Sequence, residues 1–82
     1  MREITVDVVI DANKECLNPG EPFGILDNNR LESALGNQWA PYELDEQIIA
    51  SVFRSLIQNH PFMNANKRTA VLAMEVLADS TK

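Results

Sequence analysis

The sequence predicts an all-α fold, a single mostly helical domain over residues 1–82 with a short irregular or β-hairpin connection near residues 36–43. Three observations predict it. Apolar residues recur at three- and four-residue spacing in several segments, which is typical of amphipathic helices. Clusters rich in Gly, Pro and Asn separate those segments. The hydrophobic content of 45% is enough for a core, and a chain of 82 residues holds one domain at most.

The first two helices are predicted from their caps and their breakers. Thr5 is expected to cap a helix whose buried stripe is Val6, Val9, Ile10 and Leu17. Residues 18–24, NPGEPFG, form a breaker cluster and are expected to be a loop. Asp27 is expected to cap a short helix over Asn28–Leu35, which Gly36 would end.

The second half of the chain carries the clearest helical pattern. Residues 36–43, GNQWAPYE, contain Pro41 and are predicted to be the irregular or hairpin-like connection. From Leu44 to Gln58 the apolar residues form one broad helical face. Pro61 should stop that helix within a few residues. A last helix is expected to begin near Ala65.

We expect the domain to lack further C-terminal helices. Residues 78–82, ADSTK, follow the last apolar turn directly, with no glycine cap and no returning element. The faces of the terminal helices would then need a partner. The expectation is a truncated chain, a decayed gene or a chain that completes its core by association.

Composition excludes several classes of protein. Cys16 is the single cysteine, so neither an intrachain disulfide nor a zinc-like cysteine cluster is expected. The N-terminus mixes charges into its apolar residues, unlike a signal peptide, and no apolar stretch is long enough to cross a membrane. A net charge of −5 argues against non-specific nucleic-acid binding. We therefore expect a cytoplasmic protein without membrane or direct nucleic-acid partners.

The charge is unevenly distributed along the chain. Residues 47–74 contain no Asp or Glu, whereas Arg54, Lys67 and Arg68 all lie there. A buried helix explains the lack of acids over residues 48–57. It does not explain the polar residues 58–70, so this segment indicates an anion site.

That segment contains residues 60–68, HPFMNANKR, at the start of the last helix. The first N–H groups of a helix have no intrahelical partner and carry partial positive charge. Ala65 is small enough for an anion to approach this backbone, and Asn66 adds an amide donor. Lys67 and Arg68 place two cations where they oppose the helix dipole, which indicates a bound phosphate that offsets the cost. Arg68 would hold it in bidentate fashion.

His60 precedes this anion site, and the next two residues are expected to fix the loop. Pro61 restricts its neighbours and Phe62 would anchor the turn in the core. A neutral imidazole beside a polyphosphate can take a proton from a hydroxyl, which is general-base help in phosphoryl or nucleotidyl transfer. The alternatives are a structural His60, an Asn64 that only caps the helix, and solvated surface cations; the combined spacing favours the functional interpretation.

The motif HPFMNANKR also resembles the signature of the Fic/Doc family, His-Pro-Phe-x-(Asp/Glu)-(Gly/Ala)-Asn-(Gly/Lys)-Arg, and departs from it only at Asn64. Residues 23–35, FGILDNNRLESAL, and residues 4–13, ITVDVVIDAN, are similar to segments of Doc-type, "death-on-curing" members. The resemblance implies a mostly α-helical domain whose motif loop binds ATP or another nucleoside triphosphate. It also implies modification of a hydroxyl on a target protein.

By position in the motif, the resemblance implies a role for each residue. His60 matches the catalytic base, and Asn66, Lys67 and Arg68 match the phosphate-binding residues. Lys67 is the Doc-type choice, which implies a toxin that transfers the terminal phosphate. An AMP transferase of the Fic type is one alternative. A weak or inactive domain that binds only nucleotide or a partner is another.

The departures from the family pattern imply further expectations. Asn64 stands where an acid usually helps to hold Mg²⁺; an amide oxygen brings no charge, so weaker metal binding is expected.

Residues 36–43 match the target-binding flap, where Trp39 and Tyr42 line a peptide groove or pin the connection to the core. The chain lacks the family's inhibitory (Ser/Thr)-x-x-x-Glu-(Gly/Asn) sequence, so a separate, Phd-like antitoxin would supply it.

Overall fold

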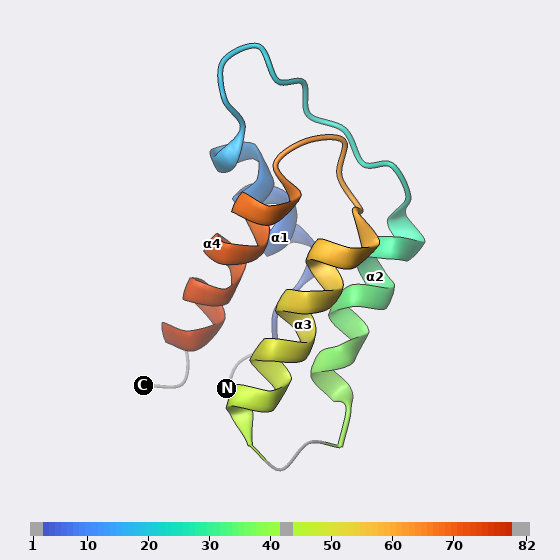
Figure 1. Ribbon diagram of the computed structural model, residues 1–82, viewed down its shortest axis with the longest axis vertical. Helices are drawn as coiled ribbons and strands as arrows, with labels where there is room; N and C mark the ends of the chain where they lie inside the picture. Colours follow the sequence, from blue (N-terminus) through green and yellow to red (C-terminus); the bar gives the residue numbers. More distant parts are fainter. Residues whose placement is uncertain (1–2, 42–43, 80–82) are drawn as a thin grey trace.

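The computed structural model describes residues 3–41 and 44–79. Over these residues the elements follow the order α1 (Val6–Cys16), α2 (Asn28–Gly36), η1 (Asn37–Trp39), α3 (Asp45–Asn59) and α4 (Asn66–Asp79). The predicted all-α fold is confirmed, because these described residues form helices and no sheet (Figure 1). Within the same residues, no helix combines the length and the apolar character that crossing a membrane requires.

Helix α1 begins at its predicted cap, since the Oγ1 of Thr5 accepts a 3.3 Å hydrogen bond from the N–H of Val8. The helix ends at Cys16, so Leu17 lies just past it and is only partly buried. The prediction that Leu17 continues the buried stripe is therefore not met. The polar side chain of Asn13 is fully buried instead.

Helix α2 begins as predicted, because an Oδ1 of Asp27 accepts a 2.8 Å bond from the N–H of Asn29. Its end differs from the prediction. Gly36 has an ordinary helical φ of −59°, and the chain continues directly into η1. The side chain of Asn37 stabilises this junction by donating to the carbonyl of Ala34 and to the hydroxyl of Ser55 in α3, at 3.1 and 2.7 Å.

Helix α3 runs over almost the range that the apolar pattern predicts. At its start the N–H of Leu44 donates to the side-chain oxygen of Gln47, at 3.1 Å. It ends at Asn59 because His60 adopts the left-handed conformation and Pro61 follows. This confirms Pro61 as the helix stop.

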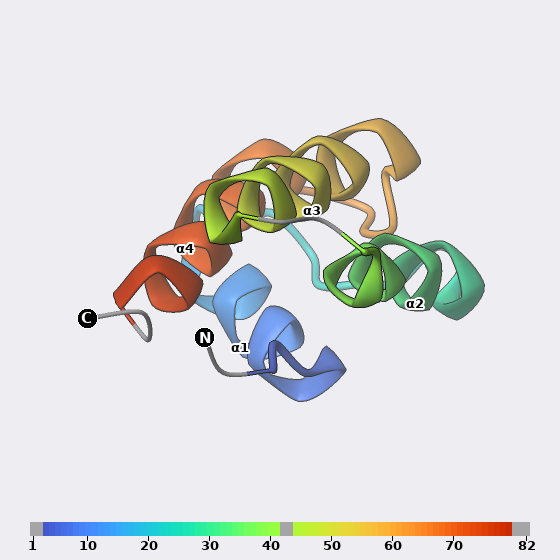
Figure 2. The ribbon, with the colours of Figure 1, turned by 90° about the horizontal axis from the view of Figure 1, so that it is seen from below.

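Among the described α-helices, α3 and α4 lie in the middle of the packing, with α2 against α3 and α1 against α4. Helix α3 contacts both α2 and α4, and α1 contacts α4 from below (Figure 2). The core residues come from every described α-helix, from Ile4 before α1 and from the loop before α4, and include Val9, Leu31, Ala34, Leu35, Val52, Leu56, Phe62, Ala70 and Ala73. Burial of this set positions the segment between α3 and α4, which contains the sequence motif.

The two ends of α3 lie far apart. At one end the chain passes through η1 and residues 40–41, at the bottom of Figure 1. At the other end residues 60–65 connect α3 to α4, beside the long segment between α1 and α2 (Figure 1). Since α3 has 15 residues, the rise of 1.5 Å per residue separates these ends by about 22 Å.

Candidate functional site

We call residues 60–65 the motif loop. Both of its end residues are left-handed without being glycine: His60 has a φ of 46° and Ala65 a φ of 64°. Such a conformation costs an L-residue about 1 kcal/mol, so the surrounding contacts must hold the loop. Pro61 and Phe62, which belong to the loop, help to fix it because both of their side chains are buried. Their predicted structural role agrees with this placement.

Asn66 holds the loop from the first turn of α4. Its Oδ1 accepts from the N–H of Phe62 and its Nδ2 donates to the carbonyl of Phe62, both at 2.9 Å. The side-chain amide therefore pairs with one backbone unit as a neighbouring strand would. The sequence predicts this amide as a phosphate donor, but both of its polar atoms bond Phe62. The backbone N–H of Asn66 has no partner among the described residues.

Asn13 supports the loop from α1, and sequence reasoning missed it. Its Nδ2 donates to the carbonyl of Asn64 and to the Oγ1 of Thr69, both at 2.9 Å. Its Oδ1 has no partner among the described residues although it is buried. The available signal was position: residue 13 follows Val9 by four and so lies on the buried stripe, where a polar side chain needs partners.

A second segment, residues 18–26, runs along the motif loop, and we call it the cover segment. The N–H of Met63 donates to the carbonyl of Gly24, and the N–H of Leu26 donates to the carbonyl of Pro61, both at 2.8 Å. These two bonds form an isolated antiparallel bridge. The loop is thus paired on one side with the cover segment and on the other with the Asn66 amide.

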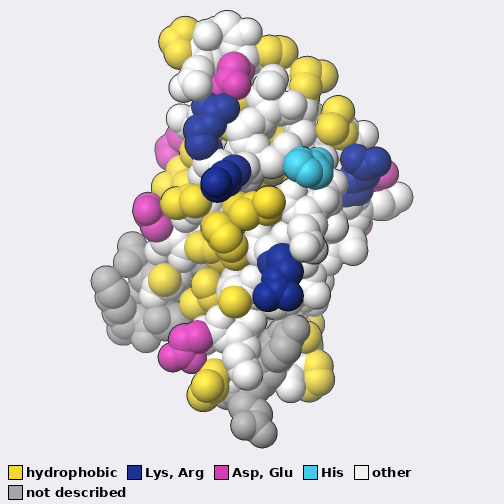
Figure 3. Space-filling model, in the orientation of Figure 1, with side chains coloured by type: hydrophobic (Ala, Val, Ile, Leu, Met, Phe, Trp, Pro, Cys, Tyr) yellow, Lys and Arg dark blue, Asp and Glu magenta, His cyan; other side chains and the backbone are white. Residues whose placement is uncertain are grey.

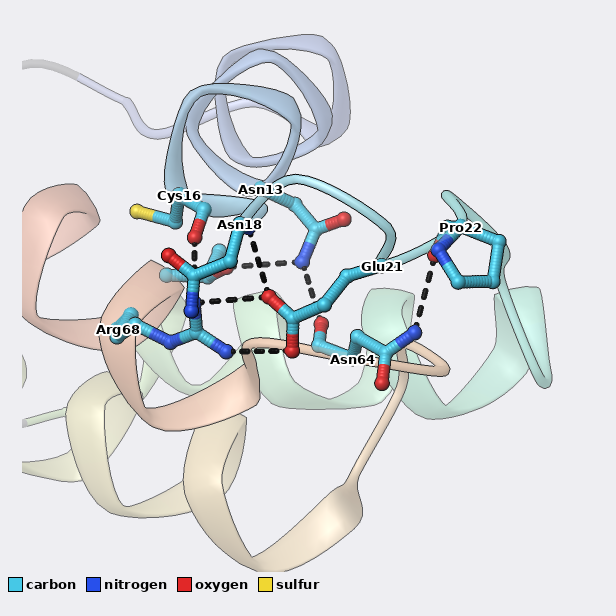
Figure 4. A network of polar contacts seen from close by, with 8 residues as sticks. Asn13, Cys16, Asn18, Glu21, Pro22, Asn64 and Arg68 are labelled. Carbon is cyan, nitrogen blue, oxygen red and sulfur yellow. Dashed lines mark hydrogen bonds and ion pairs between the residues drawn. The ribbon is translucent and has the colours of Figure 1, made fainter.

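Side chains extend this contact. The Nδ2 of Asn64 donates to the carbonyl of Pro22 at 3.1 Å (Figure 4). The rings of Phe23 and Phe62 lie 6.4 Å apart between centroids, and the Lys14 ammonium lies 5.0 Å from the centre of the Phe23 ring. Since the side chain of Asn64 bonds Pro22, it does not cap α4 through the N–H of Lys67, contrary to the capping interpretation.

Arg68 is held by the cover segment at the far end of the motif. Its Nη1 and Nη2 donate to the two carboxylate oxygens of Glu21, each at 2.9 Å, and Nη1 also donates to the carbonyl of Cys16 at 2.8 Å (Figure 4). The same carboxylate accepts a 2.7 Å bond from the N–H of Asn18. These hydrogen bonds, first that from Arg68 and then that from Asn18, lower the pKa of Glu21.

The Glu21 carboxylate thus pairs with Arg68, the residue that the sequence predicts to hold phosphate. A guanidinium has five N–H donors, and three of those of Arg68 are used by Glu21 and Cys16. A phosphate can pair fully with Arg68 only after Glu21 leaves. Sequence reasoning gave no role to Glu21, because an acid inside a Pro- and Gly-rich loop carries no local signal for a partner 47 positions away.

The start of α4 is less occupied. Thr69 is the first residue whose N–H is bonded along the helix, to the carbonyl of Ala65 at 2.8 Å. Among the described residues, nothing accepts from the N–H groups of residues 66–68. Lys67 is exposed and forms no ion pair within the described chain. These groups remain available to an anion.

At the opposite end of the motif loop, His60 is exposed. Figure 3 shows its imidazole (cyan) at the surface, with Lys and Arg side chains on either side. No hydrogen bond joins the imidazole to any described residue. It borders an open pocket of about 530 Å³ between α2 and α3. The predicted base is therefore accessible rather than a buried structural histidine.

The Fic/DOC family model matches residues 3–78, which include the cover segment, the motif loop and the helices on both sides. The chain belongs to the Fic/DOC family. No curated protein and no solved structure gives a significant match. Membership supports a transferase that modifies its target with a nucleoside triphosphate, in general terms.

The structure does not bring every predicted site residue of this Fic/DOC domain together. Trp39 is 66% exposed in η1, so its ring is not pinned to the core. Trp39 lies in η1, which packs beside α3 and precedes the start of that helix, whereas His60 follows its end. Tyr42 falls outside the described residues. The segment that lies against the motif loop is 18–26.

Few of the described side chains near the motif loop could hold Mg²⁺. Asn64 offers a neutral Oδ1, which accepts no hydrogen bond from the described residues. Over residues 3–41 and 44–79, no three His, Cys, Asp or Glu side chains gather in a way that would hold a metal ion. Mg²⁺ prefers several oxygen ligands, usually including carboxylates or phosphates, so these side chains alone do not fit the ion.

Proposed function

We propose that this Fic/DOC domain transfers the terminal phosphate of ATP or another nucleoside triphosphate to a hydroxyl of a target protein, as a Doc-like toxin. The observation that carries the proposal is the exposed imidazole of His60 at one end of a loop whose other end opens α4. A base and a set of unpaired helix amides, joined by one rigid loop, suit in-line transfer to an acceptor.

In this proposal the triphosphate lies against the N–H groups of residues 66–68, and Lys67 supplies a positive charge. Ala65 has only a methyl group, which leaves room for phosphate oxygens. His60 takes the proton of the hydroxyl, whose oxygen attacks the γ-phosphorus. The bond from that phosphorus to the bridging oxygen breaks, and the nucleoside diphosphate leaves. Phe62 and Asn66 keep the loop fixed throughout.

Arg68 joins the site only when Glu21 gives way. A triphosphate carries more negative charge than one carboxylate, and guanidinium binds phosphate in the same bidentate geometry. The exchange replaces one anion by another at Arg68, and the released Glu21 carboxylate is exposed enough to turn to solvent. Mg²⁺ would arrive bound to the nucleotide, with the Oδ1 of Asn64 as a protein ligand; the steps above do not depend on it.

The cover segment offers the target an edge. In the bridge with the motif loop, the bonds come from the neighbours of Ile25, so its own N–H and C=O point to the other side. Neither group has a partner among the described residues. An extended target segment can pair there and present its hydroxyl near His60. The target-binding role predicted for Trp39 and Tyr42 is thereby proposed for the edge at Ile25.

Other parts of the proposal follow from the family. A separate, Phd-like antitoxin is the proposed regulator, and the cytoplasm is the proposed compartment. AMP transfer remains the alternative reaction at the same site.

A second function, nucleotide or partner binding without transfer, is favoured by two observations. Arg68 is already paired with Glu21, and the metal position carries Asn64.

Incubation with a cell extract and ATP labelled at the γ- or α-phosphorus separates these functions. Label on a protein from γ-ATP alone supports phosphate transfer. Label from α-ATP shows that AMP is transferred instead. No label from either, with nucleotide still bound, leaves the binding function and refutes the transferase.

A further inference from the structure

The pocket beside His60 is not explained by the phosphate site. One wall comes from the first turns of α2, and the other from the end of α3 and from His60, whose imidazole is cyan in Figure 3. The lining residues are all polar: Asn29, Arg30, Ser33, Gln58, Asn59 and His60. The pocket is about 530 Å³ and open, a size that suits a side chain and its neighbouring backbone.

The lining favours an anion. It includes one guanidinium, an imidazole, amides and a hydroxyl, and no carboxylate. The nearest described acid partner of Arg30 is Asp27, whose Oδ2 lies 3.9 Å from the Nε with both side chains about half exposed. The other oxygen of Asp27 caps the N–H of Asn29. Because exposed pairs of this length are weak, the Nη groups of Arg30 remain available.

The two walls are already joined. The Nδ2 of Asn59 donates to the carbonyl of Arg30 at 3.1 Å, so this bond fixes the end of α3 to the first part of α2. The Arg30 N–H also donates to the carbonyl of Asp27 at 3.2 Å, which fixes the backbone that carries the guanidinium. A ligand therefore meets a preformed pocket, and little ordering opposes its binding.

We propose that this pocket binds a carboxylate side chain, Asp or Glu, that neighbours the acceptor hydroxyl on the target protein. The inference rests on the proposed function, since it assigns the pocket to the acceptor side of His60. A nucleobase is a poorer occupant, because no aliphatic side chain and no Phe, Tyr or Trp lines the pocket. The triphosphate has its own donors at the start of α4. Arg30 is the residue that selects the acidic neighbour.

The test uses short peptides that centre on Ser, with Glu or with Gln beside it, and no nucleotide. The chain contains one histidine, so the imidazole signals in an NMR titration belong to His60 without ambiguity. We expect the Glu peptide to shift these signals and the Nε–H signal of Arg30, and to bind more tightly than the Gln peptide. Arg30→Gln should remove this preference, a loss of roughly fivefold for an exposed charge pair.

Arg54→Gln is the matched control. Like Arg30, Arg54 is an exposed arginine, but it lies on α3 and does not line this pocket. It should leave the preference unchanged. Arg30→Lys, which keeps the charge, should retain part of it, and circular dichroism checks that each variant is folded. Equal binding of the Glu and Gln peptides, an equal effect of Arg54→Gln, or ATP displacing the peptide from Arg30 would overturn the assignment.

Binding and transfer fail separately in this design. A carboxylate preference without any label transfer in the γ-ATP assay would refute the proposed reaction and retain the pocket assignment. Transfer that is equally fast to Glu and Gln peptides would refute the pocket assignment and retain the reaction.

Discussion

The two ends of the motif HPFMNANKR, His60 and Arg68, have different surroundings in the structure. At the Arg68 end, the exposed guanidinium is hydrogen-bonded to the Glu21 carboxylate of the cover segment and to the backbone carbonyl of Cys16. At the His60 end, the imidazole is exposed beside an open polar pocket. The motif HPFMNANKR thus presents an accessible base at one end and an arginine that is already paired at the other.

This difference separates folding from function along the loop. The Arg68 end is tied to α1 and to the cover segment by hydrogen bonds, so changes there should alter stability and anion affinity together. The His60 imidazole has no hydrogen bond to any described residue, so changes to this side chain should alter chemistry more than stability. The predictions below test this contrast, beginning with the largest effect.

Replacement of His60 by Asn should reduce label transfer by roughly 10²–10⁴-fold, the usual contribution of a general base. Asn tolerates the left-handed conformation of this position better than most residues, so the urea midpoint should stay near that of the wild type. Transfer at the wild-type rate would exclude His60 as the base. A collapse of the midpoint would instead make the residue structural.

Replacement of Asn13 by Ala should lower the free energy of unfolding by about 1–3 kcal/mol, because buried partners in the loop and in α4 lose their hydrogen bonds. Asn29→Ala is the control: Asn29 is exposed, and only its backbone N–H is used by the cap. Urea unfolding measures both. Equal losses in the two variants would show that Asn13 does not support the Arg68 end.

Replacement of Glu21 by Gln should raise nucleotide affinity several-fold, since Arg68 is then free of its ion pair. Glu32→Gln removes the same charge from an exposed position on α2, so it separates local release from a general change in net charge. Isothermal titration with ATP compares the variants. If both glutamates have the same effect, Glu21 does not compete for Arg68.

Replacement of Asn64 by Asp should increase the Mg²⁺ dependence of nucleotide binding by a few-fold, because a carboxylate adds charge to the metal position. The measurement is a nucleotide titration with and without Mg²⁺. Unchanged metal dependence would show that Asn64 serves only its bond to Pro22.

Acid should loosen the cover segment by a smaller amount. The pKa of Glu21 is lowered in the folded protein by its hydrogen bonds to Arg68 and Asn18. Its stabilising contribution is therefore complete above the ordinary glutamate pKa and is lost as the pH falls through the lowered pKa. Amide exchange over residues 18–26, corrected for intrinsic rates, should accelerate on acidification in the wild type. Glu21→Gln should show no such change.

Local features of this fold could be predicted from the sequence. The caps at Thr5 and Asp27, the long apolar face of α3 and the stop before Pro61 all depend on residues within a few positions of one another. The motif itself located the loop and its exposed histidine. The prediction that Gly36 ends α2 with a glycine cap was wrong, because a glycine can also continue a helix when the chain needs no left-handed turn.

The contacts that assemble the site could not be predicted, because they join distant parts of the chain. The bonds from Asn13 span 51 and 56 positions, and the Glu21–Arg68 pair spans 47. Periodicity carries no information about such partners. For the same reason the pairing of the cover segment with the motif loop, between Ile25 and Phe62, had no signal in the sequence.

A crystal structure of the domain with a non-hydrolysable ATP analogue tests the central claim most directly. We predict triphosphate oxygens against the N–H groups of residues 66–68, with the Arg68 guanidinium turned from Glu21 to phosphate and His60 still exposed. An analogue bound elsewhere, or no binding at saturating concentration with the Glu21–Arg68 pair intact, would contradict it.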